Sequence, residues 1–341
     1  MSRREAILEG RAAAARLHDR LASHRHIEAN GGPIDVFGAL LAVNAALVFR
    51  PLDGLLGFCI KGPDVPGVVI STQRSLHIQR FTGSHELGHV ELGHTLSLDG
   101  EEILERGGFS KNEKEIAADS FASAFLLPKW LMQTQARRQK WNRIDMEDPM
   151  KVYQMSLRLG ASFTATAIAL ERNEIIDEAT RDRLVNVPLR KVKQSLLGSF
   201  TPPNFYPDVW LITELDHGQP IEGGPNDLFV IRLPEMGSAG YLWDLSKLKA
   251  SGFAVLQDRR EIDEPEISLG GATTRNVTAQ QPEPGNKEDE PPLPRCGSIE
   301  LEQRRPWQKD AAPAASLSLP YDLSGKEVGM PRVVRRQLLA A

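Results

Sequence analysis

The hydrophobic pattern of this 341-residue chain changes its period at about residue 200. Before that point apolar residues recur mostly at helical spacing. After Phe200 short alternating runs, separated by clusters of Gly, Pro and Asp, predict at least five strands. A single domain fold cannot accommodate both hydrophobic patterns, and the chain is long enough for two or three domains. We therefore expect a multidomain protein with an α+β unit over residues 1–132, a helical segment over 133–198 and a β-sandwich over 200–341.

The first unit mixes helix and strand signals. The run PIDVFGALLAVNAALVFRPL predicts a helix followed by a strand, and GLLGFCIKG and PGVVIST predict two strands joined by a turn. A helix follows over IQRFTGSHELGHVELGH, and a further helix begins near Asn112 and ends before Pro128. These signals together predict an α+β fold for residues 1–132.

The first of these two helices contains an HExxH motif, formed by His85, Glu86 and His89. Histidines four residues apart point from one face of a helix and can bind a single Zn2+ ion. Glu86 lies beside them and can accept a proton from a metal-bound water. The two cysteines, Cys59 and Cys296, have no metal-ligand spacing, so a metal site has to use histidines and carboxylates.

The next helix offers a third ligand. Glu115 is our candidate, because Asp119 lies four residues further on the same face and can accept the second N–H of a ligand histidine. Glu113 is the rival ligand, and a solvated helix start is the alternative explanation of the acidic pair. We expect His94 to be a capping or surface histidine.

These residues resemble the ImmA/IrrE family of metallopeptidases over residues 30–132, through RFTGSHELGHVELGH and EIAADSFASAFLLP. The resemblance implies a cytoplasmic, gluzincin-like zinc endopeptidase with His85, His89 and Glu115 as ligands and Glu86 as general base. Family members commonly act with helix-turn-helix repressors, which they cleave in stress responses, mobile-element induction or phage defence. Many relatives carry an acidic residue where this chain has Ala117, and the spacing to Asp119 favours Glu115 as the ligand.

A tetrahedral oxyanion on the substrate needs an electrophilic partner, which such enzymes usually take from a Tyr, His or Arg. No tyrosine precedes Tyr153 in the sequence. Elimination therefore leaves Tyr153, His77 and Arg80 as candidates for contact with the oxyanion or the substrate.

The middle segment has the rhythm of a helix-turn-helix unit, with its turn at 159–162. It is the one positively biased block, with twelve basic and eight acidic residues over 133–196. If this unit bound DNA, its second helix would present polar side chains to the base edges, but residues 163–167 contain no Arg, Lys, Asn or Gln. We favour a structural helical subdomain, and direct nucleic-acid binding is not expected. Basic residues that could still contact phosphate are Arg181, Arg183, Arg190, Lys191 and Lys193.

Three clusters in the C-terminal part, GSAGYLW at 237–243, GGA at 270–272 and RPW at 305–307, predict loops at one end of an antiparallel, immunoglobulin-like β-sandwich. In this order they resemble the chagasin-like inhibitors of cysteine peptidases over residues 208–323. The first loop departs from the family pattern at 236–239. The candidate partner-binding residues are Gly240, Tyr241, Gly270, Gly271, Arg305, Pro306 and Trp307. We expect Trp243 to pack in the core and residues 281–294 to form a disordered insertion.

The formal net charge of −4 gives no whole-chain attraction to nucleic acid or acidic membranes. Neither a signal peptide nor an apolar stretch of membrane-spanning length is recognised, so we expect a cytoplasmic protein. The predicted function is a zinc-dependent endopeptidase, zinc being replaceable by another divalent metal, that cleaves an intracellular helix-turn-helix regulator. The C-terminal domain would bind a protein partner or regulate the protease. The alternatives are a non-catalytic regulator or protein-binding module and, third, DNA binding through the middle helices.

Overall fold

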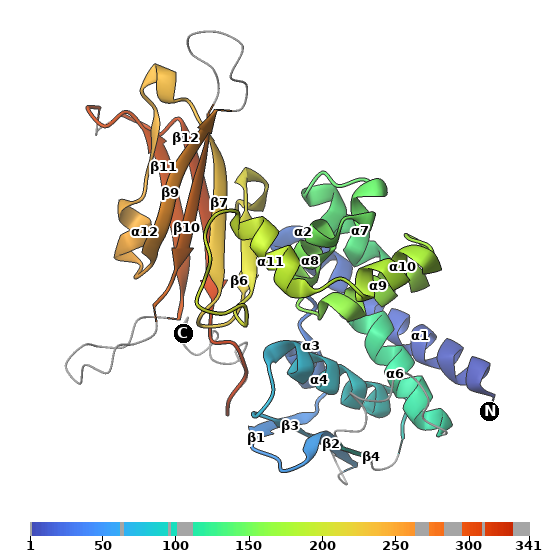
Figure 1. Cartoon of the computed structure of the whole chain (residues 1–341). Helices are drawn as coiled ribbons and strands as arrows, with labels where there is room; N and C mark the ends of the chain where they lie inside the picture. Colours follow the sequence, from blue (N-terminus) through green and yellow to red (C-terminus); the bar gives the residue numbers. More distant parts are fainter. Residues whose placement is uncertain are drawn as a thin grey trace. The chain divides into compact units, whose positions relative to one another are not determined.

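The structure is a computed structural model that describes residues 2–61, 65–94, 97–100, 112–262, 273–282, 295–308 and 311–329 (Figure 1). Its contacts divide the chain into two compact units. Unit 1 comprises residues 1–135, 158–181 and 326–341, and unit 2 comprises residues 136–157 and 182–325. The protein is thus multidomain, with a helical N-terminal part and a C-terminal sheet domain. Among the described helices, none has the length and apolar character needed to cross a membrane.

The elements up to residue 197 are mostly helical. The helices are α1 (Arg3–Arg20), α2 (Ser23–Asn30), α3 (Val36–Ala42), α4 (Leu76–Glu91), α6 (Glu113–Leu126), α7 (Lys129–Arg138), α8 (Pro149–Arg158), α9 (Phe163–Arg172), α10 (Glu178–Val185) and α11 (Leu189–Leu197). The strands are β1 (Ala46–Arg50), β2 (Leu55–Lys61), β3 (Pro66–Ser71) and β4 (Ser97–Gly100).

The four strands of unit 1 form one sheet in the order β1-β3-β2-β4. β1 runs parallel to β3, whereas β2 is antiparallel to both β3 and β4. Helix α4 contacts β2 and β3 and carries the HExxH residues. The sequence pattern predicted the first three strands, and β4 is an addition to that prediction.

Helix α6 lies against both α1 and α4, and small residues permit these close contacts. A Cβ atom added to Gly10 of α1 would lie 2.2 Å from the carbonyl oxygen of Ala117. A Cβ atom added to Gly88 of α4 would lie 3.2 Å from the Cα atom of Ala118. Both alanines are fully buried, so α6 packs closely against α1 and α4 at these two glycines.

A short C-terminal segment, residues 326–329, completes unit 1. The buried amide of Gln79 in α4 donates to the carbonyl of Glu327 at 2.9 Å and accepts from its N–H at 2.7 Å. Gln79 also donates to the carbonyl of Ser71 at the end of β3. An antiparallel bridge joins Phe49 of the edge strand β1 to Gly329. The end of the described chain is therefore bound both to the sheet edge and to the helix that carries His85.

The two helices α8 and α9 flank the predicted turn at 159–162. Gly160 has a φ of +64°, which a side chain rarely adopts, and Ser162 caps α9 by accepting from the N–H of Ala165 at 3.1 Å. The second helix buries Thr166, Ala167 and Leu170. This burial supports the structural interpretation of the middle helices.

Unit 2 ends in a β-sandwich. Its elements are β5 (Val209–Ile212), β6 (Ile221–Glu222), β7 (Leu228–Glu235), β8 (Leu242–Asp244), α12 (Ser246–Ala250), β9 (Ala254–Ile262), β10 (Thr273–Gln280), β11 (Cys296–Arg304) and β12 (Ala315–Asp322). The sheets have the orders β5-β7-β10-β9 and β6-β12-β11-β8. Inward-facing residues of both sheets form one core, which includes Trp243 as predicted. Of the predicted insertion, residues 283–294 lie outside the described residues.

The expectation of an entirely antiparallel sandwich is wrong at two strand pairs. β5 is parallel to β7 and β6 is parallel to β12, while the other pairs are antiparallel. The chain leaves the first sheet after β5, contributes β6 to the second sheet and returns for β7, so β7 can repeat the direction of β5. Alternating hydrophobicity identifies the buried face of a strand but not its direction, which explains the error.

His18 of α1 is a buried histidine in the packing of unit 1. Its ring stacks on Phe125 of α6 with centroids 4.5 Å apart, and its Nε2–H donates to the Phe125 carbonyl at 3.0 Å. Among the described residues, the buried Nδ1 atom has no hydrogen-bond partner. Burial lowers the pKa of His18 to about 4, against the opposing effect of the bond to Phe125.

This pKa predicts a pH dependence of stability. As the pH falls from about 6.5 to about 4, the unfolded chain binds a proton at His18 that the folded chain excludes. The free energy of unfolding should therefore fall by up to about 1.4 kcal/mol per pH unit from this group. Replacing His18→Phe keeps an aromatic ring on Phe125 and should flatten the dependence in equilibrium denaturation between pH 7 and 4. The exposed His26→Phe serves as control, and an unchanged slope in His18→Phe would contradict the assignment.

Candidate metal centre

His85 and His89 lie on the buried face of α4, and both are 2% exposed. Their spacing brings the two Nε2 atoms to 3.0 Å from each other. The rings meet edge to face, with centroids 4.8 Å apart. Two nitrogen ligands of the type that zinc prefers thus point into the same small volume.

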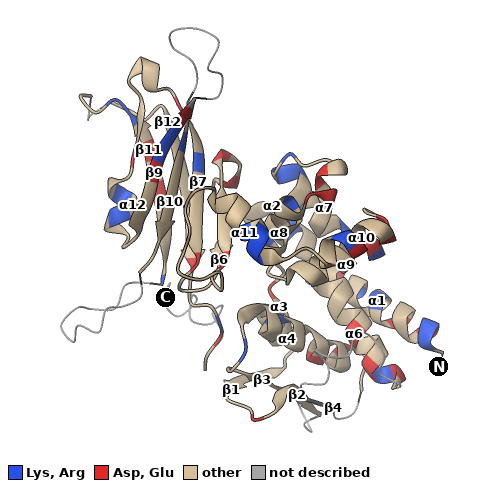
Figure 2. Ribbon diagram, in the orientation of Figure 1, with Lys and Arg blue, Asp and Glu red and all other residues tan. Residues whose placement is uncertain are grey.

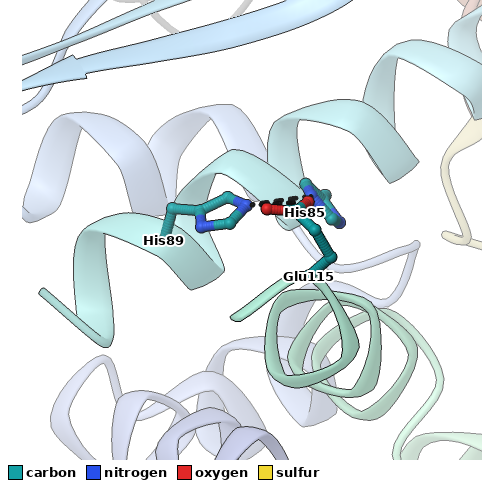
Figure 3. A group of neighbouring side chains, drawn as sticks. All are labelled: His85, His89 and Glu115. Atoms are coloured by element: carbon teal, nitrogen blue, oxygen red, sulfur yellow. Dashed lines mark hydrogen bonds and ion pairs between the residues drawn. The ribbon is translucent and has the colours of Figure 1, made fainter. Parts of the chain in front are cut away.

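Glu115 comes from the first turn of α6. Asn112 caps this helix by accepting from the N–H of Lys114 at 3.1 Å, which fixes where the helix starts. The Oε2 atom of Glu115 lies 3.2 Å from Nε2 of His85 and 3.5 Å from Nε2 of His89 (Figure 3). Among the described residues, His85, His89 and Glu115 form the group whose ligand atoms, all within 4.8 Å of one another, could hold a metal ion.

The geometry of this group suits zinc. Bonds of about 2.0–2.1 Å in tetrahedral geometry separate neighbouring ligand atoms by about 3.3 Å. The three observed separations of 3.0, 3.2 and 3.5 Å bracket that value. Two imidazoles and one carboxylate are also a ligand set of catalytic zinc sites, which keep a fourth position for water or substrate.

Each histidine of the pair has a contact at its other ring nitrogen. Nδ1 of His85 lies 2.9 Å from Oδ1 of Asp119, as the i,i+4 spacing of Glu115 and Asp119 predicted. Nδ1 of His89 lies 2.9 Å from Nδ1 of His94. We expected His94 to be a capping or surface residue, and the contact with His89 was missed.

The electrostatics of the group reflect its burial. Burial alone would raise the pKa of Glu115, but hydrogen bonds with His85 and His89 outweigh it and hold this pKa well below its usual range. Burial, together with the neighbouring charge of His89, lowers the pKa of His94 to about 4. The carboxylate of Glu115 is therefore ionised, and the imidazole of His94 neutral, at physiological pH.

Glu86, directly after His85 in α4, is fully buried. Its Oε1 atom lies 3.8 Å from the position that a Cβ atom would take on Gly57 of β2, so the carboxylate lies close to the sheet. Glu113, the rival ligand, is outside the group that could hold a metal among the described residues. Ala117 is fully buried, and its carbonyl faces Gly10 of α1.

The structure describes all three candidates for contact with the oxyanion or the substrate. His77 is exposed in the first turn of α4, with Nδ1 3.3 Å from the hydroxyl of Ser75. The buried Arg80 guanidinium lies under Gly160, where an added Cβ atom would be 2.3 Å from Nη1. The hydroxyl of Tyr153, in unit 2, donates to Asp208 at 2.7 Å.

Two basic residues of the middle helices, Lys193 and Arg190, contact other groups of unit 2. Lys193 is 6% exposed, and its ammonium group donates to the carbonyls of Phe205 and Pro207 and pairs with Asp208 at 3.1 Å. The guanidinium of Arg190 lies over the ring of Phe205 at 5.1 Å. Figure 2 shows acidic and basic residues mixed on α10, so this segment does not present a uniform basic face.

The sandwich loops meet at a second candidate site. Arg305 lies over the ring of Tyr241 at 4.5 Å and donates from Nε to the carbonyl of Ala239 at 3.1 Å. A Cβ atom added to Gly240 would lie 2.4 Å from the ring of Trp307, which is 69% exposed. Pro306 joins Arg305 to Trp307. The predicted loop residues Gly270 and Gly271 lie outside the described residues.

Two family models match this chain. Residues 52–171 match the family model for the IrrE N-terminal-like domain, Peptidase M78. Residues 224–320 match the model for the chagasin family peptidase inhibitor I42. Both resemblances inferred from the motifs are thereby confirmed. The first match supports a metallopeptidase-type enzyme, and the second supports a protein-binding module of the chagasin type.

Solved structures similar to this chain include the cysteine protease inhibitor EhICP2 from Entamoeba histolytica. It is 22% identical, with a TM-score of 0.28, and the match covers 35% of this chain and 99% of the inhibitor. The solution structure of Amebosin is 21% identical, with a TM-score of 0.23, and the match covers 34% of this chain and 97% of that protein. No curated protein matches this chain.

Proposed function

We propose that this protein is a zinc-dependent endopeptidase of the gluzincin type, with His85, His89 and Glu115 as the metal ligands. The observation that carries the proposal is the convergence of two imidazole nitrogens and one carboxylate oxygen within 4.8 Å, from two helices. The match of residues 52–171 to a metallopeptidase family supports the same function.

A bound zinc ion would supply Lewis acidity, which polarises a peptide carbonyl and lowers the pKa of a coordinated water towards neutrality. Glu86, directly after His85 in α4, would accept a proton at its carboxylate and pass it to the leaving amine. Asp119 would hold His85 by accepting its Nδ1–H at 2.9 Å, so that Nε2 keeps its lone pair for the metal.

The substrate we propose is an intracellular protein, specifically a helix-turn-helix regulator. The support is the resemblance of the HExxH helix and of α6 to a family whose members commonly cleave such regulators. The proposed setting is a stress response, control of a mobile element or phage defence. Direct DNA binding is the weakest alternative, since Lys193 is buried against backbone carbonyls and α10 carries both signs of charge.

The proposed role of Glu86 predicts the behaviour of Glu86→Gln. This variant keeps the three ligands, so the purified protein should retain about one zinc per chain by elemental analysis. It should lose at least about 100-fold in cleavage of a co-expressed helix-turn-helix regulator, because the amide cannot accept the proton. Glu91→Gln, at the end of the same helix, is the matched control and should cleave normally.

Cleavage by Glu86→Gln at the wild-type rate would contradict this function. Zinc retained by a wild-type protein that cuts no partner would favour the alternative, a non-catalytic regulator in which the metal is structural.

We propose that the sandwich loops hold the protein partner of the peptidase. The exposed ring of Trp307 against Gly240, and Arg305 over Tyr241, form a rigid aromatic and cationic surface of the kind that dominates protein interfaces. The match of residues 224–320 to a peptidase-inhibitor family supports binding to a protein. An intramolecular contact with the peptidase domain would be an alternative use of the same loops.

Trp307→Ala tests this surface. In the inactive Glu86→Gln background it should weaken capture of the regulator by at least about 10-fold, as measured by surface plasmon resonance. Tyr206→Ala removes another exposed aromatic ring of unit 2, 91% exposed in the structure, and should leave the affinity unchanged. Equal affinities of the two variants would show that the Trp307 loop does not hold the regulator.

A further inference from the structure

The contact between His89 and His94 has no role in the function proposed so far. The Nε2 atom of His89 faces His85 and Glu115, at 3.0 and 3.5 Å. Its Nδ1 atom faces away from them, 2.9 Å from Nδ1 of His94, and the ring centroids are 5.0 Å apart. His94 thus contacts the outer nitrogen of a proposed ligand, as Asp119 does for His85.

The backbone places His94 at this point through the way α4 ends. Leu92 is the last residue with helical dihedrals, and Gly93 follows with a φ of +66°. The N–H of Gly93 donates to the carbonyl of Val90 at 3.2 Å, and the N–H of His94 donates to the carbonyl of His89 at 2.9 Å. These two bonds are the Schellman motif of helix C-termini. The motif folds residue 94 back over residue 89, so backbone and ring of His94 both contact His89.

The donor and acceptor in the ring contact follow from the metal site. An imidazole that binds a metal through Nε2 carries its proton on Nδ1. That N–H of His89 has to donate to Nδ1 of His94, which must then be unprotonated, so His94 carries its proton on Nε2.

We propose that His94 is a positioning residue for the metal centre, which accepts the Nδ1–H of His89 and fixes the tautomer and the orientation of its ring. The proposal rests on the zinc site of the proposed function. The two ligand histidines would then be held by different acceptors, a carboxylate for His85 and a neutral imidazole for His89.

Zinc affinity tests this role independently of catalysis. The full-length protein is titrated with zinc in competition with a chromogenic chelator. His94→Leu removes the acceptor and should weaken zinc binding about 10–100-fold. His94→Asn places its side-chain oxygen near the former Nδ1 position and should remain within about 3-fold of the wild type. His26→Leu, the same replacement at an exposed histidine of α2, is the matched control and should bind zinc normally.

The outcomes separate the two proposals. Absence of zinc binding by the wild-type protein would refute the zinc site, and with it the role of His94. Wild-type affinity in His94→Leu, or equal weakening in His94→Leu and His94→Asn, would refute the positioning role alone.

A measurement on the unmodified protein covers the case in which the leucine variant fails to fold. In the 15N NMR spectrum of the zinc-loaded wild type with 15N-labelled histidines, His94 should be protonated at Nε2 and unprotonated at Nδ1. Protonation of His94 at Nδ1 would overturn the proposal, because both facing nitrogens would then carry protons.

Discussion

The close approach of α6 to α4 is the constraint on which the candidate metal centre depends. The ligand atoms of His85 and Glu115 are 3.2 Å apart although they come from different helices, which demands a short distance between the helix axes. Gly88 provides that distance on the α4 side, and Ala118 on the α6 side. Gly10 allows α1 to lie close to α6 at Ala117, which is buried. An acidic side chain at 117 would enter this buried helix contact rather than the metal group.

The residues of the candidate ligand set carry local sequence signals. Helical periodicity puts His85 and His89 on one face and places Glu115 and Asp119 on one face of the following helix. The Asn112 cap fixes the start of that helix, so the register of Glu115 follows from local signals. Local signals of this kind identify residues within one helix or turn, and they single out the three residues that the structure brings together.

Features that depend on tertiary contacts could not be predicted in this way. The parallel pairing of β5 with β7 depends on which sheet receives β6, and alternation along a strand carries no such information. Tyr153 became an oxyanion candidate by elimination alone, and no local signal indicates the hydrogen bond that its hydroxyl donates to Asp208. The position of His94 follows from a local signal that we missed. A glycine directly after a helix indicates the Schellman motif, and this motif returns the next residue to the last turn of the helix.

The C-terminal segment changes how the domains are to be understood. By sequence the sandwich looks like a module appended to a peptidase, and the family match of its residues ends at 320. Beyond it, Glu327 satisfies both hydrogen-bonding ends of the buried Gln79 amide, six residues before His85 in α4. The sandwich is therefore inserted between two parts of unit 1.

This topology bears on how the peptidase can be separated from its sandwich. A truncation after residue 200 would leave the Gln79 amide buried without the partners that Glu327 supplies, at a cost of about 1–3 kcal/mol per unsatisfied group. It would also uncover the edge of β1 at Phe49. Loss of activity in such a truncation would then follow from damage to the support of α4, whether or not the sandwich binds a partner. Substitutions on the loops, which leave Glu327 in place, are the cleaner way to separate the two domains' roles.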